Sequence, residues 1–134
     1  MAVNVIVLGA GYASTGAITK LQSELSDNAQ LTWIADVDYH LVLHESHRVI
    51  RDPSVRSDIT FPVDEIADPS TQFIQDKVIG LNVEDQVVEL AASDDVEYDY
   101  VLVALGSQTA YYGIPGLEEH SLTLKSLDDA LEIH

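Results

Sequence analysis

The sequence predicts an α/β fold in which a central parallel sheet carries an inserted antiparallel β-meander. An apolar, β-branched run at residues 3–8 ends at a glycine, the next segment changes to a helical period, and another apolar run follows at residues 98–105. A chain of 134 residues is long enough to build its own core. We therefore expect residues 1–134 to form a single domain.

The first 35 residues predict one β-α-β unit. Residues 3–8 (VNVIVL) have the composition of a buried parallel strand, and residues 31–35 (LTWIA) that of a second one. Between them, apolar side chains recur at the spacing of one helix face, and this helix ends near Ser26. These apolar residues are Ala13, Ala17, Ile18, Leu21 and Leu25. The segment has the length that a strand, a crossover helix and a parallel strand require.

The elements that follow are less regular. Residues 40–50 (HLVLHESHRVI) predict a short helix, which Pro53 would end. Residues 71–79 and 86–91 alternate apolar and polar side chains on either side of the turn NVEDQ, and they predict a hairpin or a three-stranded meander. Residues 98–105 (YDYVLVAL) are apolar enough to rejoin the central sheet.

The composition argues against several classes of function. The formal charge is −17, from 23 acidic and 6 basic side chains, so nucleic acid is not an expected partner. The acidic residues are dispersed in a chain of 46% hydrophobic composition, which is typical of folded proteins from salt-loving organisms; an ordinary acidic protein is the alternative. Without cysteine, redox chemistry needs a cofactor. The absence of a membrane-spanning run and of a signal peptide favours a cytoplasmic protein.

The loop GAGYASTG at residues 9–16 has the features of a dinucleotide cradle. Gly9 permits a tight turn at the strand end, and Gly11 lets a pyrophosphate approach the backbone at a helix N-terminus. Ser14 stands where such loops carry a third glycine, and we expect Gly16 to relieve crowding between helix and strand. The loop alone is equally compatible with a plain strand-turn-helix connection.

A carboxylate after the second strand is the expected partner of ribose hydroxyls. Asp36 lies 36 − 11 = 25 positions after Gly11, directly after LTWIA, and Asp38 follows closely. A solvated surface charge is the alternative for both. Combined with the glycine loop and the β-α-β unit, Asp36 favours a dinucleotide site.

The second half of the chain resembles the FAD-binding region of two-dinucleotide flavoproteins. The resemblance rests on YDYVLVALGS, on IPG at residues 114–116 and on the helix start DAL, together with VIVLGAGYAS and VDYHLVLH in the first half. It runs along nearly the whole chain. The chain looks most like type II NADH:quinone oxidoreductases and their sulfide:quinone relatives among pyridine nucleotide-disulfide oxidoreductase-like flavoproteins. The resemblance implies a Rossmann-like FAD-binding fold, FAD as cofactor, and NAD(P)H as the substrate of the full-length protein.

The resemblance also implies cofactor-binding residues by position. It assigns the glycine loop to the pyrophosphate, an acid to the ribose, a strand backbone to the adenine, and the turn A-L-G-S to a second approach to the cofactor. In this order the residues are Gly9, Gly11, Tyr12, Ala13 and Ser14; Asp36; Val78; and Ala104, Leu105, Gly106 and Ser107. The family's usual acid position falls on Ala35. His44 and Glu45 fall near the isoalloxazine or on the surface, and no catalytic residue is assigned.

Two departures from the family pattern are visible. The C-x4-C pair of the disulfide-reductase branch is absent, so we exclude the chemistry of that branch. The NADH-binding domain and the C-terminal membrane-binding part are also absent, and a helix predicted from Ser126 continues to His134. We therefore expect a partial FAD/NAD(P)-binding domain of a longer protein, peripheral to the cytoplasmic face of a membrane, with a homodimer as one expected assembly. Alone, the chain is expected to bind FAD weakly or to leave the site empty, and to lack NADH dehydrogenase activity.

Two alternatives remain open at this point, and a third is disfavoured. The chain could be a non-catalytic nucleotide-binding module or part of a sulfide:quinone reductase-like flavoprotein. The third alternative is a metal site, because His40, His44 and His47 have helical spacing. No H-E-x-x-H pattern accompanies them, so we predict no metal site.

Overall fold

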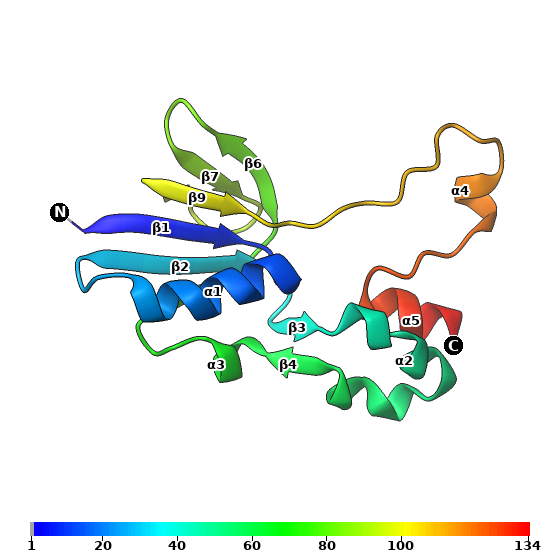
Figure 1. Ribbon diagram of the computed structural model, residues 1–134. Coiled ribbons are helices and arrows are strands. Elements are labelled where there is room, and N and C mark those ends of the chain that lie inside the picture. The colour runs from blue at the N-terminus through cyan, green and yellow to red at the C-terminus, as the bar shows by residue number, and fades with distance from the viewer. Residues whose placement is uncertain (1) are drawn as a thin grey trace. The chain divides into compact units, whose positions relative to one another are not determined.

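The computed structural model describes residues 2–134 (Figure 1). The chain divides into two compact units. The sheet unit comprises the residues up to His40 together with Pro62–Leu105, and the helical unit comprises Leu41–Phe61 and Gly106–His134. Each unit has its own hydrophobic core.

The sheet unit is built on a four-stranded parallel sheet. Its strands are β1 (Val3–Leu8), β2 (Ala29–Ala35), β5 (Gln72–Gln75) and β9 (Tyr100–Val103), in the order β5-β2-β1-β9. Helix α1 (Tyr12–Glu24) connects β1 to β2, and the register of these two strands runs from Val3 opposite Ala29 to Leu8 opposite Ile34. The predicted β-α-β unit and the return of residues 98–105 to the central sheet are therefore confirmed.

The two faces of the central sheet are covered by different elements (Figure 1). On one face, Ile6 and Leu8 pack against Val88 and the other apolar residues of an antiparallel meander. The meander consists of β6 (Val78–Asn82), β7 (Val87–Leu90) and β8 (Val96–Glu97). On the other face, Val7 packs with Ile18 of α1 and with Trp33. This alternation follows from the period of two along a strand and buries both faces.

The structure corrects the prediction for residues 71–79. We expected this segment to be one strand of the meander, but β5 joins the central sheet parallel to β2, and a separate strand, β6, begins at Val78. Between them the buried Asp76 accepts the backbone N–H groups of Lys77, Ala92 and Ser93. Alternation indicates a half-buried strand but carries no information about the sheet to which the strand belongs.

The helical unit is formed by short elements around Val49, Ile59 and Ala130. Its helices are η1 (Leu43–Glu45), α2 (His47–Arg51), η2 (Pro53–Asp58), α4 (Leu117–His120) and α5 (Leu127–Ile133). The prediction of one helix over residues 40–50 is wrong at its start, because residues 39–41 are extended, and residues 43–45 form a separate 3-10 helix before α2. The stop before Pro53 and the helix start at Ser126 are confirmed.

Three short elements complete the fold. Strands β3 (Tyr39–Leu41) and β4 (Thr60–Pro62) pair with each other, and α3 (Val63–Ile66) follows directly. The backbone N–H of Val63 donates to the carbonyl of Asp38 at 2.8 Å, which fixes the start of α3 beside the end of the first chain segment of the sheet unit. Among residues 2–134, no helix combines the length and the apolar composition needed to cross a membrane.

Candidate functional site

The candidate site lies where the parallel strands of the sheet unit end. Strand β1 has β2 on one side and β9 on the other. The strand that follows β1 in the chain is therefore added on one side of it, and the last strand of the sheet is added on the opposite side. Open α/β sheets bind ligands at the carboxyl ends of their strands at such a reversal. The glycine loop, residues 9–11, joins β1 to α1 at this edge.

Gly9 is required by the fold itself. Its φ of +103° is strained for any residue with a side chain, and a Cβ atom there would collide with the carbonyl oxygen of Ala104. Its N–H donates to the carbonyl of Ile34 at 2.8 Å, and the N–H of Ala104 donates to Leu8 at 3.0 Å. The structure therefore brings the predicted residues Gly9 and Ala104 together.

Gly11 has no such requirement. Its φ of −80° suits any residue, and a Cβ atom there would meet nothing within 4 Å in the described chain. Gly11 is the N-cap of α1, which has no acidic residue in its first turn and no side-chain cap within residues 2–134. The space in front of a helix N-terminus, with its donors and partial positive charge, is thus open for an anion, and a side chain at position 11 would fill it.

Ser14 fills the position of the family's third glycine. Its side chain is completely buried, and its Oγ donates to the Gly11 carbonyl at 3.0 Å. Ser14 is therefore small enough to allow the close packing of helix and strand that a glycine permits in the family. Gly16 is exposed, and a Cβ atom there would meet nothing within 4 Å, so the expectation that Gly16 relieves crowding is wrong.

Two side chains that sequence reasoning did not assign to the site hold the glycine loop. The indole Nε1 of Trp33 donates to the Gly9 carbonyl at 2.6 Å, and His40 Nδ1 lies 2.9 Å from the carbonyl oxygen of Ala10. The ring of His40 also meets that of Tyr12 edge to face, at a centroid distance of 5.1 Å. One sequence signal was present for Trp33: a tryptophan inside a buried strand needs an acceptor for its N–H.

The predicted contacts to the adenosine half lie at the same strand ends. Asp36 is exposed and directly follows β2. The carbonyl of Ala35, the residue before Asp36, accepts the N–H of Asp76 at 2.9 Å. Val78 lies two residues beyond Asp76 and packs at the edge of the Ile6 cluster. Asp36 therefore stands at the edge of the sheet where the glycine loop lies.

The turn after β9 is divided between the two units. Ala104 and Leu105 belong to the sheet unit, and Leu105 is exposed. Gly106 and Ser107 begin the second segment of the helical unit, where Lys125 Nζ donates to the Ser107 hydroxyl at 2.9 Å. Of these four predicted residues, Ala104 and Leu105 lie against the glycine loop: a Cβ atom at Gly9 would collide with the Ala104 carbonyl oxygen and stand 3.2 Å from the Leu105 α-carbon.

The remaining candidates lie in the helical unit. His44 and Glu45 form part of η1, where a Glu45 carboxylate oxygen lies 3.6 Å from His44 Nε2 and the other lies 3.6 Å from an Arg48 nitrogen. His40, His44 and His47 fall in β3, η1 and α2, so they do not share one helix face. Among residues 2–134, no group of three or more His, Asp or Glu side chains is arranged to hold a metal ion.

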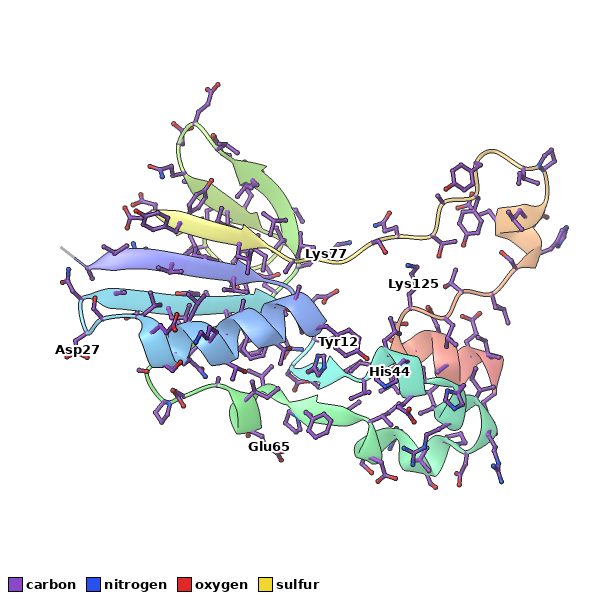
Figure 2. The ribbon with its side chains drawn as sticks, viewed as in Figure 1. Tyr12, Asp27, His44, Glu65, Lys77 and Lys125 are labelled. Atoms are coloured by element: carbon purple, nitrogen blue, oxygen red, sulfur yellow. The ribbon has the colours of Figure 1, made fainter. Side chains whose placement is uncertain are left out.

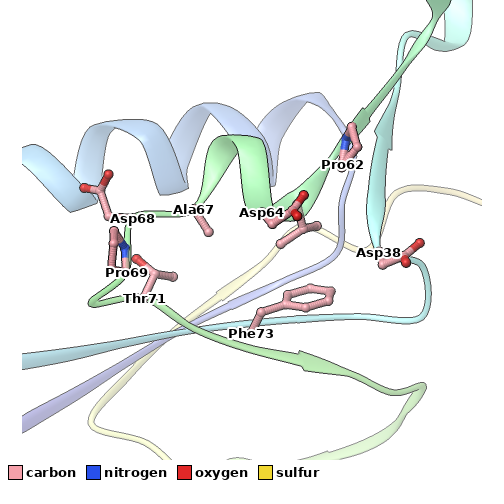
Figure 3. Close-up of a pocket in the computed structure, with 9 residues that line it drawn as sticks. Asp38, Pro62, Asp64, Ala67, Asp68, Pro69, Thr71 and Phe73 are labelled. Atoms are coloured by element: carbon pink, nitrogen blue, oxygen red, sulfur yellow. The ribbon is translucent and has the colours of Figure 1, made fainter. Parts of the chain in front are cut away.

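A separate cavity of about 630 Å³ lies between α3 and β5 in the sheet unit (Figure 3). Three carboxylates line it, those of Asp38, Asp64 and Asp68, next to the Phe73 ring. A pyrophosphate would be repelled there. The cavity is therefore not the place for the anionic part of a dinucleotide, which leaves the glycine loop as its candidate site.

Comparison with known proteins agrees with this geometry. The sequence profile of the pyridine nucleotide-disulphide oxidoreductase family matches residues 3–134. The chain belongs to this family. It is 30% identical over 131 residues to a type II NADH:quinone oxidoreductase of Staphylococcus haemolyticus. The match covers 96% of this chain and 32% of that protein. The chain thus spans about a third of the length of the curated relatives it matches.

Solved structures share the fold of this chain. NDH2 from Plasmodium falciparum in complex with NADH superposes with a TM-score of 0.84 at 19% identity, covering 99% of this chain and 28% of that one. The sulfide:quinone oxidoreductase of Aquifex aeolicus superposes with a TM-score of 0.83 at 24% identity, covering 98% and 30%. These neighbours show the Rossmann-like α/β architecture of this chain.

Proposed function

We propose that this chain binds FAD through the glycine loop and forms the flavin-binding part of an NAD(P)H:quinone oxidoreductase. The observation that carries the proposal is the open space at Gly11, directly in front of the N-terminus of α1. The family of the chain and the relatives named type II NADH:quinone oxidoreductase support the oxidoreductase class. A neighbour solved in complex with NADH supports NAD(P)H as the electron donor of the whole protein.

The residues at the site divide the binding of FAD among them. The backbone N–H groups at the start of α1, from Tyr12, Ala13 and Ser14, would receive the pyrophosphate over Gly11. The Asp36 carboxylate would accept hydrogen bonds from ribose hydroxyls, and the backbone of Val78 would meet the adenine. When bound, FAD supplies the hydride acceptor and the relay of two electrons to an acceptor.

The turn after β9 is proposed as the second approach of the chain to the cofactor. Ala104 is already fixed against Gly9, and Leu105, Gly106 and Ser107 continue from it. The chain spans about a third of its relatives, so the NAD(P)H and quinone sites, a peripheral membrane contact and a homodimer are proposed for the whole protein. By itself the chain is proposed to lack NADH dehydrogenase activity.

A sulfide:quinone reductase-like function is the second candidate. The Aquifex aeolicus neighbour with a TM-score of 0.83 supports it at the level of the fold. The two candidates share the FAD site and differ in the electron donor. We prefer NAD(P)H as the donor, because the curated relatives that the chain matches are named type II NADH:quinone oxidoreductases.

The test compares two glycine-to-valine substitutions on the same helix. Gly11→Val puts a branched side chain into the space proposed for the pyrophosphate, whereas Gly16→Val fills an equally open position five residues further on. We expect the chain to bind FAD, Gly11→Val to bind it at least about ten-fold more weakly, and Gly16→Val to bind it like the wild type.

Binding is measured by titrating each protein with FAD and following flavin fluorescence, with far-UV circular dichroism to confirm that each variant is folded. The same substitution at position 16 controls for the cost of placing valine in α1. A wild-type chain that does not bind FAD, or a folded Gly11→Val variant that binds it equally well, would contradict the proposal.

A further inference from the structure

We propose that His40 is a positioning residue of the glycine loop: by holding the Ala10 carbonyl, it turns the N–H of Gly11 toward the anion site. The inference rests on the proposed function, because it concerns the same cradle. It assigns a role to a buried histidine that lies 29 positions after Gly11 (40 − 11) and outside the glycine motif.

All three carbonyls of the glycine loop are held by donors of the protein. Trp33 Nε1 donates to the Gly9 carbonyl at 2.6 Å, and His40 Nδ1 lies 2.9 Å from the Ala10 oxygen. The Gly11 carbonyl accepts the Thr15 N–H and the Ser14 hydroxyl, both at 3.0 Å. The loop therefore turns its acceptors toward the protein, and an anion in front of α1 would meet none of them.

The orientation of the carbonyls determines that of the donors. In a trans peptide the C=O of one residue and the N–H of the next point in opposite directions. Because His40 and Trp33 hold the carbonyls of Ala10 and Gly9, the N–H groups of Gly11 and Ala10 point away from these two side chains. The Gly11 N–H thus stands beside the open space at its own α-carbon, where the helix N-terminus also directs its donors.

His40 is needed because the Ala10–Gly11 peptide could otherwise turn over. Glycine tolerates a wide range of φ, so rotation of this peptide meets little resistance at Gly11. A turned peptide would present the Ala10 oxygen to the pyrophosphate and remove one N–H donor. The imidazole of His40 selects the orientation that favours an anion before the ligand arrives, and such preorganisation increases affinity.

The surroundings of His40 suit this role. His40 is only 8% exposed, and Tyr12, the first residue of α1, packs its ring edge to face against the imidazole. Figure 2 shows Tyr12 at the amino end of α1 near β3, the strand that carries His40. A carbonyl oxygen only accepts hydrogen bonds, so Nδ1 of His40 must carry a proton, in either the neutral or the charged ring.

Two variants of nearly equal shape test the inference. In His40→Asn, the amide Nδ2 stands at the same number of bonds from the backbone as Nδ1 of histidine and can donate to Ala10. In His40→Leu, a methyl group takes that place and cannot donate. We expect His40→Leu to bind FAD about ten-fold more weakly than the wild type, and His40→Asn to stay within about three-fold of it.

The measurement is an FAD titration of each full chain, with Gly11→Val as the variant that blocks the cradle. If the wild type does not bind FAD, the proposed function fails. If the wild type binds FAD and loses the flavin with Gly11→Val, while His40→Leu and His40→Asn have equal affinities, the proposed function stands and the role of His40 is wrong.

A measurement on the wild type keeps the test independent of the folding of the variants. The ¹⁵N chemical shifts of the His40 ring, recorded at a pH where the ring is neutral, identify which nitrogen carries the proton. We expect the proton on Nδ1, the less common tautomer of a solvated histidine. A neutral ring with its proton on Nε2 would contradict the hydrogen bond to Ala10 and with it the inference.

Discussion

Asp76 acts as a single-residue connection between the central sheet and the meander. Asp76 is only 9% exposed, and its carboxylate accepts the N–H groups of Lys77 at 2.7 Å, Ala92 at 3.1 Å and Ser93 at 2.6 Å. The hydrogen bond from the Ser93 side chain is the largest influence on its pKa, and it outweighs the burial that acts in the opposite direction. Together these hydrogen bonds hold the pKa of Asp76 below its ordinary value of 3.8.

The lowered pKa predicts how stability changes in acid. A carboxyl group whose pKa is lower in the folded state stabilises the fold at every pH above its ordinary pKa. This contribution is lost as the pH falls through the pKa of the folded state. We expect Asp76→Asn to lower the urea midpoint at pH 7, and the difference from the wild type to shrink on going from pH 5 to pH 2. Asp27→Asn, at an exposed turn, is the control, and its urea midpoint should stay close to that of the wild type at every pH. An Asp76→Asn effect of equal size at every pH would contradict the ionic role.

The residues of the glycine loop show how far sequence reasoning reaches. The spacing of Gly9 and Gly11 predicted a turn and a cradle, because both are local properties of a strand followed by a helix. The spacing did not predict Trp33 and His40, because which side chain reaches which carbonyl depends on the packing of segments 24 to 30 positions apart. Gly106 and Ser107 belong to a different unit from the glycine loop, and their contact with the cofactor therefore stays a prediction.

At the scale of elements, two serines that precede helices differ in what they contribute. Ser126 begins α5 with a capping box: its hydroxyl accepts the Asp129 N–H at 3.0 Å, and the Asp129 carboxylate accepts the Ser126 N–H at 3.2 Å. Ser46 precedes α2 but caps no N–H with its side chain, and its buried hydroxyl has no hydrogen-bond partner within residues 2–134.

The two serines therefore predict opposite results for the same substitution. Ser126→Ala removes a cap and should lower the free energy of unfolding by about 1 kcal/mol. Ser46→Ala removes a hydroxyl that is buried without compensation, so stability should stay constant or rise by up to about 1 kcal/mol. Urea unfolding of both variants and the wild type checks the pair. A loss of stability with Ser46→Ala as large as that with Ser126→Ala would show that both hydroxyls cap their helices.

The elements themselves were predicted where one residue period persisted, and mispredicted where it changed within a segment. Residues 3–8 and the helix after Gly11 each keep one period over their whole length. Residues 71–79 combine the end of one sheet with the start of another, and the break at Asp76 is visible only from the N–H groups that converge on its carboxylate. Residues 40–50 pass from strand to 3-10 helix to α-helix within eleven positions, because no apolar stripe is sustained long enough to favour one form.

At the scale of the whole molecule, the charge balance dominates the physics. The chain carries 23 acidic and 6 basic side chains, so most carboxylates have no cation near them. The exposed ion pairs, such as that of Lys20 with Glu24 at 2.6 Å, compensate only a small part of this charge, and exposed pairs contribute little stability each. Mutual repulsion of the remaining carboxylates therefore opposes the compact state.

Salt should stabilise this chain by screening that repulsion. The Debye length falls from about 10 Å at 0.1 M to about 3 Å at 1 M salt, so exposed charges that are farther apart than this length are largely screened. We expect the thermal midpoint in sodium chloride to rise by at least about 4 °C between these concentrations, as a gain of roughly 1 kcal/mol would produce in a domain of this size.

A matched variant separates screening from general salt effects. Amide replacements at five exposed acids, Asp27, Glu65, Glu84, Asp94 and Glu118, change the formal charge from −17 to −17 + 5 = −12. Since this variant repels itself less, its midpoint should start higher and rise less with salt. A midpoint that does not rise in the wild type, or that rises equally in both proteins, would mean that charge repulsion does not limit the stability of this fold.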